Sequence, residues 1–175
     1  NTLIIPEGQH GLSENQSFLN WIKDGGHAIV MGNSATGFCK EEFGISEKEI
    51  KDSTSGIGYA QLEREQISST IIGAIFNTQL DNSHPLSFGL KKYHTLKLSS
   101  TAYQMKDAAV IRLDKNAQPE NGFVGYKVLN NQSNALVAGK TSYGRGNITF
   151  LVDNPLFRGF WEQGKQLVSN ALFFE

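Results

Sequence analysis

The sequence predicts an α/β fold in which a mostly parallel sheet is covered by helices on both faces. Two buried strands are expected at residues 2–6 and 28–31, and each precedes a segment with helical features. Both strands are uninterrupted apolar runs, which is typical of strands buried on both faces. Near the other end of the chain, the strand at 148–152 leads through a polar cap at Asp153 into a helix.

Capping and glycine signals define the elements of the first quarter. Ser13 begins a helix, and Gln16, three residues later, completes a capping box. This helix ends at Gly25, because glycine accepts the left-handed conformation at a helix C-terminus. A tight turn at 32–34 then leads into a short helix expected over residues 35–43.

The middle of the chain is less regular. Residues 46–51 are expected to be helical, whereas 57–66 fit either a helix or a strand. Apolar runs and polar–apolar alternation predict further strands, at 71–76, 94–98, 108–113, 123–128 and 135–139. A hairpin-like turn at 143–146 precedes the strand at 148–152. The last helix is expected over 157–173, where apolar residues recur at helical spacing.

Composition excludes several classes of protein. The 175 residues fit one domain, spanning 1–175, that is long enough to bury a core. A net charge of -1 without a basic run argues against binding to nucleic acid or to an anionic membrane. No apolar run approaches the roughly 20 residues that span a bilayer. The chain begins at Asn1 rather than Met, so we expect a processed protein or a piece of a longer one.

Two side chains qualify as possible nucleophiles, and structural roles are favoured for both. Cys39 would need an activating base and an exposed position, but it follows Phe38 in a predicted amphipathic helix. A small buried hydrophobe is the expected role. Ser34 lies at a strand-to-helix turn, as in a nucleophile elbow, but position 36 is threonine instead of glycine. We therefore expect Ser34 to cap the helix.

The histidines do not predict a metal site. None of them is followed by an acidic residue three positions later, and no two fall at helical ligand spacing; they are His10, His27, His84 and His94.

Two turns are candidates for binding a small ligand. The segment 32–37 lies at a predicted helix N-terminus, where free backbone N–H groups attract anions. Because the carboxyl ends of parallel strands meet at one edge of a sheet, the turn after 148–152 is expected beside it. The candidate ligand-binding residues are Asn33, Ser34, Asp153 and Arg158. The plain alternative is that both turns only cap helices, with Asn154 as the second cap and Pro155 in the first helical turn.

Four segments, taken together, resemble a known domain. They are TLIIPEG at 2–8, WIKDGG at 21–26, HPLSFG at 84–89 and DNPLFRGFW at 153–161. In this order they resemble the C-terminal domain of large bacterial zinc carboxypeptidase-like proteins of the carboxypeptidase A type. That domain is similar to class I glutamine amidotransferases, so the resemblance implies a flavodoxin-like three-layer sandwich. The last segment is the most specific.

The resemblance also implies a scaffold without its reactive groups. The amidotransferase cysteine would stand in the turn at 32–34, which holds Gly-Asn-Ser, and Cys39 comes about two helical turns too late. The His-x-Glu pair after the late strand is replaced by residues 153–155. The zinc-binding His-x-x-Glu of carboxypeptidases is absent as well. No catalytic residue and no cofactor are therefore expected in this chain, with zinc only in the parent peptidase domain.

The function implied by the resemblance is that of a noncatalytic accessory domain of an exported zinc carboxypeptidase, periplasmic or extracellular. Its expected partners are the peptidase domain of the same polypeptide and the peptide substrate, with no nucleic acid and no membrane insertion. Because the chain starts at what resembles an internal strand, the first strand and helix of a complete domain are expected to be missing. Two alternatives remain open. One is an independent hydrolase or amidotransferase using Ser34 or Cys39. The other is a flavodoxin-like module that binds a phosphate, flavin or sugar near 33–37 and Asp153.

Overall fold

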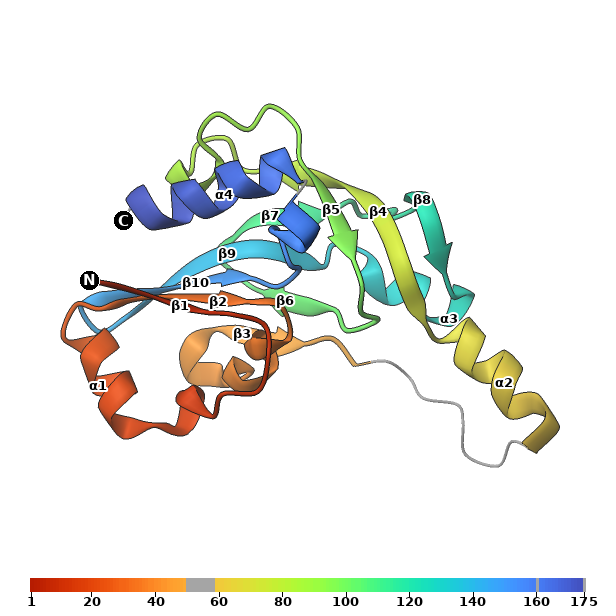
Figure 1. Ribbon diagram of the computed structural model, residues 1–175, viewed down its shortest axis with the longest axis horizontal. Coiled ribbons are helices and arrows are strands. Elements are labelled where there is room, and N and C mark those ends of the chain that lie inside the picture. Colours follow the sequence, from red (N-terminus) through yellow and green to blue (C-terminus); the bar gives the residue numbers. More distant parts are fainter. Residues whose placement is uncertain (50–58, 160, 175) are drawn as a thin grey trace.

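The computed structural model describes residues 1–49, 59–159 and 161–174. Within these residues the chain forms strands, α-helices and short 3-10 turns (Figure 1). The α-helices are α1 (Gln16–Lys23), α2 (Tyr59–Ser68), α3 (Tyr126–Leu129) and α4 (Glu162–Phe173). The strands are β1 (Thr2–Ile5), β2 (His27–Met31), β3 (Ile45–Glu47), β4 (Ile71–Leu80), β5 (His94–Lys97), β6 (Tyr103–Met105), β7 (Ala109–Leu113), β8 (Pro119–Val124), β9 (Leu136–Tyr143) and β10 (Gly146–Leu151).

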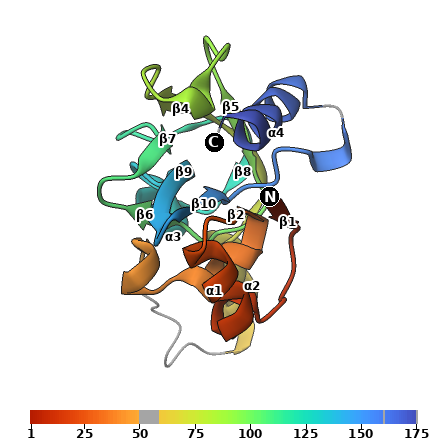
Figure 2. The same cartoon turned by 90° about the vertical axis from the view of Figure 1, so that its left-hand side faces the viewer.

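Eight strands form one mixed sheet in the order β1-β2-β10-β9-β7-β4-β5, with β8 also paired to β4. Strands β1, β2 and β10 are parallel to one another. Every other pairing in this sheet is antiparallel. β3 and β6 form a separate antiparallel pair. Figures 1 and 2 show that the large sheet curls strongly, so that it resembles half of a barrel.

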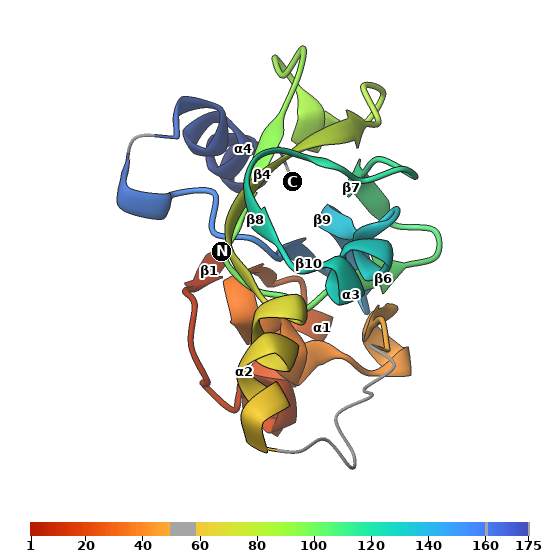
Figure 3. The ribbon, with the colours of Figure 1, turned by 90° about the vertical axis from the view of Figure 1, so that its right-hand side faces the viewer.

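The curl is centred on β4, the longest strand. Its end at residues 78–80 pairs with β7, whereas its earlier part pairs with both β5 and β8. The register with β8 shifts between Ile71 and Gly73, where Gly73 has a φ of 142° that residues with a side chain rarely adopt. Such a bulge bends a strand and increases its twist, which is consistent with the curvature of β4 and β8 in Figure 3.

The predicted flavodoxin-like sandwich, with a mostly parallel sheet and helices on both faces, is therefore wrong. Only three neighbouring strands are parallel, and the rest of the sheet is antiparallel with little helical cover. The predicted alternation of strands and helices is present at both ends of the chain. In the middle, however, most strands follow one another without an α-helix between them. An apolar run does not reveal the direction of the partner strand, so the local pattern could not exclude an antiparallel sheet.

The core has two parts, on opposite faces of β2 and β10. Ile29 and Met31 of β2 join one apolar cluster, whereas Ala28 and Val30 join the other. This division follows from the alternation of side chains along a strand. The apolar faces of α4 and α1 cover the first and the second cluster respectively.

Capping in the first quarter differs from the prediction. The N-cap of α1 is Asn15 rather than Ser13, and its Oδ1 accepts a hydrogen bond from the N–H of Phe18 at 3.0 Å. The predicted helix over 35–43 is replaced by two 3-10 segments, Gly32–Phe38 and Glu41–Phe43. The expectation that Ser34 caps this helix is also wrong, because its hydroxyl contacts the loop after β1 instead.

Later elements differ mainly in their bounds. The predicted strand over 123–128 splits into the end of β8 and the start of α3. Residues 46–47 belong to β3 instead of a helix, and residues 50–51 lie outside the described part. The ambiguous stretch 57–66 is helical from Tyr59 onward, with 57 and 58 outside the described part. The last helix begins only at Glu162, because the left-handed φ of 51° at Arg158 interrupts it.

Candidate functional site

The structure brings together two of the four residues predicted to bind a ligand. Asn33 follows β2 and Asp153 follows β10, and both line a small cavity of about 30 Å³ at the carboxyl ends of these parallel strands. Ser34 does not line this cavity. Arg158 is exposed, and its guanidinium lies 5.2 Å from the ring centroid of Phe157. The expected juxtaposition of the two turns is therefore present, but the space between them is roughly that of one water molecule.

The polar groups of the first turn hold the loop that follows β1. The backbone N–H of Gly8 donates to Asn33 Oδ1 at 2.8 Å. The Ser34 hydroxyl lies 2.6 Å from the Pro6 carbonyl oxygen and 2.8 Å from that of Gly8, and it donates toward them. The hydroxyl proton is therefore directed to backbone carbonyls and not to a side-chain base, which a nucleophilic serine requires. These contacts favour a structural role for this turn.

Asp153 belongs to a buried polar group that links β10 to β5. Its Oδ1 lies 3.1 Å from the ammonium nitrogen of Lys97, and its Oδ2 accepts a hydrogen bond from the Thr95 hydroxyl at 2.6 Å. The side chains of Lys97 and Asp153 are only 2% and 8% exposed. Burial, with a smaller contribution from Asp153, raises the pKa of the neighbouring Tyr93. Asp153 is therefore held by Lys97 and Thr95 at the wall of the small cavity.

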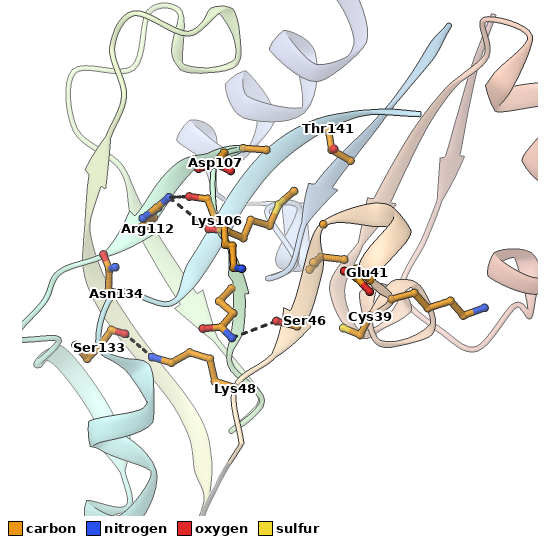
Figure 4. Close-up of a pocket in the computed structure, with 16 residues that line it drawn as sticks. Cys39, Glu41, Ser46, Lys48, Lys106, Asp107, Arg112, Ser133, Asn134 and Thr141 are labelled. Atoms are coloured by element: carbon orange, nitrogen blue, oxygen red, sulfur yellow. Dashed lines mark hydrogen bonds between the residues drawn. The ribbon is translucent and has the colours of Figure 1, made fainter. Parts of the chain in front are cut away.

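A larger cavity lies between the β3–β6 pair, the start of β7 and the turn before β9 (Figure 4). Its volume is about 730 Å³, which is within the range of small-molecule sites. None of the four predicted ligand-binding residues lines it, although Cys39 does. We call this space the β3–β6 cavity and regard it as the candidate site.

Cations predominate among the charged side chains of the β3–β6 cavity. The cations are Lys40, Lys48, Lys106 and Arg112, and the acids are Glu41 and Asp107. Lys40 is directed elsewhere, because its ammonium donates to the Ser13 carbonyl and lies 3.9 Å from Glu14. The other three cations line the cavity.

Lys48 and Arg112 are held in place by backbone carbonyls. The Lys48 ammonium donates to the Ser133 carbonyl at 2.6 Å, and the Arg112 guanidinium donates to the Met105 and Lys106 carbonyls at 3.4 and 3.2 Å (Figure 4). Burial lowers the pKa of Lys48. A partly desolvated ammonium that contacts a neutral carbonyl gains from an added anion. The cavity thus offers fixed positive charge to a ligand.

Polar neutral groups complete the lining. Gln104 donates from its amide to the Ser46 hydroxyl at 3.2 Å, which joins β6 to β3 (Figure 4). Thr141 and Asn134 add a hydroxyl and an amide to the lining. Hydroxyls and amides can both donate and accept, so they suit the polar remainder of a small organic anion.

Cys39 is not an activated nucleophile in this setting. Burial, reinforced by the negative charge of Glu47, raises the pKa of its thiol from 9.0 to about 12. Reactive cysteines show the opposite shift, because the thiolate is the attacking species. Cys39 was predicted to be a small buried hydrophobe within a helix; in the structure it follows a 3-10 segment and is only partly buried.

We expect Cys39 to react slowly with iodoacetamide in the folded chain at pH 9. With a pKa of about 12, little thiolate is present at that pH. Mass spectrometry should show alkylation at least about tenfold slower than in the urea-unfolded chain. Because the folded pKa is raised, this group's contribution to stability should also be lost as the pH rises above 9. Equal alkylation rates in the two states would contradict the described burial.

Neither a metal centre nor a membrane-spanning helix is found among the described residues. No group of three or more histidine, cysteine, aspartate or glutamate side chains there could hold a metal ion. No helix in that part of the chain has the length and apolar character needed to cross a membrane.

The comparison with solved structures finds the fold within larger enzymes. The chain is similar to a β-galactosidase from Bacillus circulans sp. alkalophilus, with 13% identity and a TM-score of 0.54. It is also similar to a β-galactosidase from Rahnella sp. R3, with 15% identity and a TM-score of 0.52. These matches cover 98% and 97% of this chain but only 22% of each enzyme. At such low identity the likeness shows the fold alone.

Comparison with sequences adds no relative, since neither family models nor curated proteins match this chain. The predicted resemblance to the C-terminal domain of zinc carboxypeptidases, and to class I glutamine amidotransferases, is wrong. The two similar structures named above are β-galactosidases. The short segments that suggested the resemblance have local roles here. For example, His84 accepts a hydrogen bond from the N–H of Leu86 and so shapes the turn of the HPLSFG segment.

Sequence reasoning missed the residues that line the β3–β6 cavity. Lys48 lies beyond the short strand β3, which was predicted as a helix, and Lys106 follows β6, which was not predicted. Arg112 falls within a predicted strand. The one sign that it could line a site was that it is a cation between two apolar neighbours. Lys106 and Arg112 are near each other in the sequence, but Lys48 is distant from both, so no local spacing could have joined all three.

Proposed function

We propose that this chain is a noncatalytic accessory domain of a larger enzyme, in which it binds a small organic anion in the β3–β6 cavity. The observation that carries the proposal is the set of three cations, Lys48, Lys106 and Arg112, around a space of about 730 Å³. Charge-assisted hydrogen bonds from such groups favour carboxylate or phosphate. The partner is a catalytic domain of the same polypeptide.

Two further observations support an accessory role. The chain aligns over nearly its whole length with about a fifth of each β-galactosidase, so this fold occurs as one portion of larger enzymes. Glycoside hydrolases are therefore the first class in which to seek the parent activity. The raised pKa of Cys39 and the backbone contacts of Ser34 weigh against an independent hydrolase or amidotransferase. Export and the lack of a cofactor remain predictions.

Anion binding is tested by calorimetric titration with inorganic phosphate and with citrate. The double variant Lys48→Gln/Lys106→Gln should bind at least about tenfold more weakly, since it removes two charge-assisted contacts. The matched control is Lys91→Gln, an exposed lysine outside the cavity, which should bind like the parent chain. Affinity should fall as the pH rises through the lowered pKa of Lys48, because the ammonium is then lost. Binding that is unchanged in the double variant would overturn the proposed site.

The noncatalytic role is tested separately with aryl β-galactosides and β-mannosides. The isolated chain should release no more aryl alcohol than buffer does. Turnover that survives purification would show that the chain is an enzyme. Removing the segment from the polypeptide that carries it should lower that enzyme's thermal stability or turnover, and no change in either would argue against an accessory role.

A further inference from the structure

A second concave surface lies beside the start of α4, away from the β3–β6 cavity. It is a shallow opening of about 450 Å³ between the start of α4 and the neighbouring strands β4, β5 and β8. Its lining includes Ile75, His94, Glu120, Asn121 and Trp161. An aromatic ring and several planar polar side chains therefore meet at one exposed site.

The indole of Trp161 is held in a fixed orientation. Its Nε1–H donates to the His94 carbonyl at 2.9 Å, which ties the ring to β5. Gln163, two residues on, secures the same strand, because its amide donates to the Lys92 carbonyl at 2.7 Å and accepts from the His94 N–H at 3.4 Å. The ring therefore loses little conformational freedom when a ligand contacts it.

Glu120 is oriented by its neighbours but remains accessible. One carboxylate oxygen accepts a hydrogen bond from the Asn77 amide, and the other lies 3.1 Å from Nε2 of His94. The ammonium of Lys92 is 3.9 Å away. The Glu120 side chain is still 40% exposed, so its remaining lone pairs can accept from a ligand.

We propose that this surface binds a neutral pyranose sugar. The C–H face of the ring would contact the apolar surface of Trp161 and Ile75, and its hydroxyls would donate to Glu120 and bond to Asn121. Lys92 lies beside Glu120 and Lys165 beside Glu162, so the charges around this surface are nearly balanced and neither an anion nor a cation gains an unpaired counter-charge. The site is independent of the β3–β6 cavity.

The test uses the intrinsic fluorescence of the chain, which contains two tryptophans, Trp21 and Trp161. In the variant Trp21→Phe, Trp161 is the sole reporter. Titration with methyl β-galactopyranoside, methyl β-glucopyranoside and methyl α-mannopyranoside, each to about 50 mM, should give a saturable change in emission with at least one sugar. No change with any of the three overturns the proposal.

Variants of the contact residues locate the site. Calorimetry should show that Trp161→Phe weakens binding of that sugar at least about fivefold, and that Glu120→Gln does the same without touching the core. The matched control Glu63→Gln, an exposed residue on α2, should bind like the parent. Unchanged binding in Glu120→Gln, which is exposed and should fold normally, overturns the assignment even if Trp161→Phe unfolds.

Two further measurements distinguish sugar binding here from cation binding and from binding in the β3–β6 cavity. Tetramethylammonium should not change the Trp161 emission; if it does and the sugars do not, the surface is a cation site and the proposal is wrong. The Lys48→Gln/Lys106→Gln variant should retain sugar binding, because its substitutions lie in the other cavity. Loss of sugar binding in that variant would also be incompatible with this site.

Discussion

Replacing Lys97 with methionine is expected to lower the free energy of unfolding by about 3–5 kcal/mol. Lys97 is buried on β5, and its partner Asp153 is nearly inaccessible as well. Methionine fills a similar volume but removes the positive charge beside the Asp153 carboxylate, which keeps its hydrogen bond from the neutral Thr95 hydroxyl. A buried charge that loses its counter-charge is among the most destabilising changes in a fold. Urea denaturation followed by circular dichroism measures the effect.

Two controls distinguish the effect of breaking the Lys97–Asp153 ion pair from the general effect of replacing a lysine with methionine. Lys91→Met changes an exposed side chain near the same strand and should stay within about 0.5 kcal/mol of the parent. The double variant Lys97→Met/Asp153→Asn removes both charges and should be more stable than Lys97→Met alone by at least about 1 kcal/mol. A Lys97→Met protein that unfolds at the parent's urea concentration would contradict the buried pair.

The second large effect is expected for Gly164→Ala in α4. A Cβ at this position would lie 1.8 Å from the Pro155 carbonyl oxygen, so either the backbone or the helix must move. In an ordinary helix interior the same change stabilises by about 1 kcal/mol. Here we expect the free energy of unfolding to fall by about 3 kcal/mol or more, because the added methyl group prevents α4 from packing against the backbone at Pro155.

The matched control for this helix is Ser169→Ala. Ser169 is exposed on α4, so alanine should raise stability by a few tenths of a kcal/mol through helix propensity alone. The two alanine substitutions therefore have opposite expected signs on one helix. Gly164→Ala with stability equal to or above that of the parent would rule out the close packing of α4 on Pro155.

Local elements could be predicted from the sequence, but the sheet could not. The apolar strands β1, β2 and β10 were predicted because each combines β-branched residues with flanking turn signals. Strands β4, β5, β7 and β9 were also predicted, but their antiparallel pairing was not, because strand direction depends on contacts distant in sequence. The α-helix predicted over 35–43 is absent, because the chain after Gly32 forms 3-10 segments instead. The start of α4 was misplaced because a left-handed Arg158 leaves no signature in the sequence.

The β3–β6 cavity was not predicted from the sequence, whereas the meeting of the two predicted turns was. The two turns at Asn33 and Asp153 do meet, as the parallel strands β2 and β10 require. Their chemistry could not be inferred, because the partner that buries Asp153 is Lys97, which lies on a strand predicted only as half-buried. The cavity residues come from a strand pair, β3 and β6, too short for sequence patterns to reveal.

The position of β10 between β2 and β9 has a consequence for synthesis of the chain. β9 and β10 are joined by a two-residue turn and can pair as soon as both have left the ribosome. β2 is made much earlier, yet one of its edges pairs with β10, where His27 faces Asn147. β2, which is fully buried in the folded chain, must therefore leave the backbone groups of one edge unpaired until β10 has been synthesised. Nascent chains that stall before β10 is made should be the aggregation-prone species, and those for which chaperones matter most.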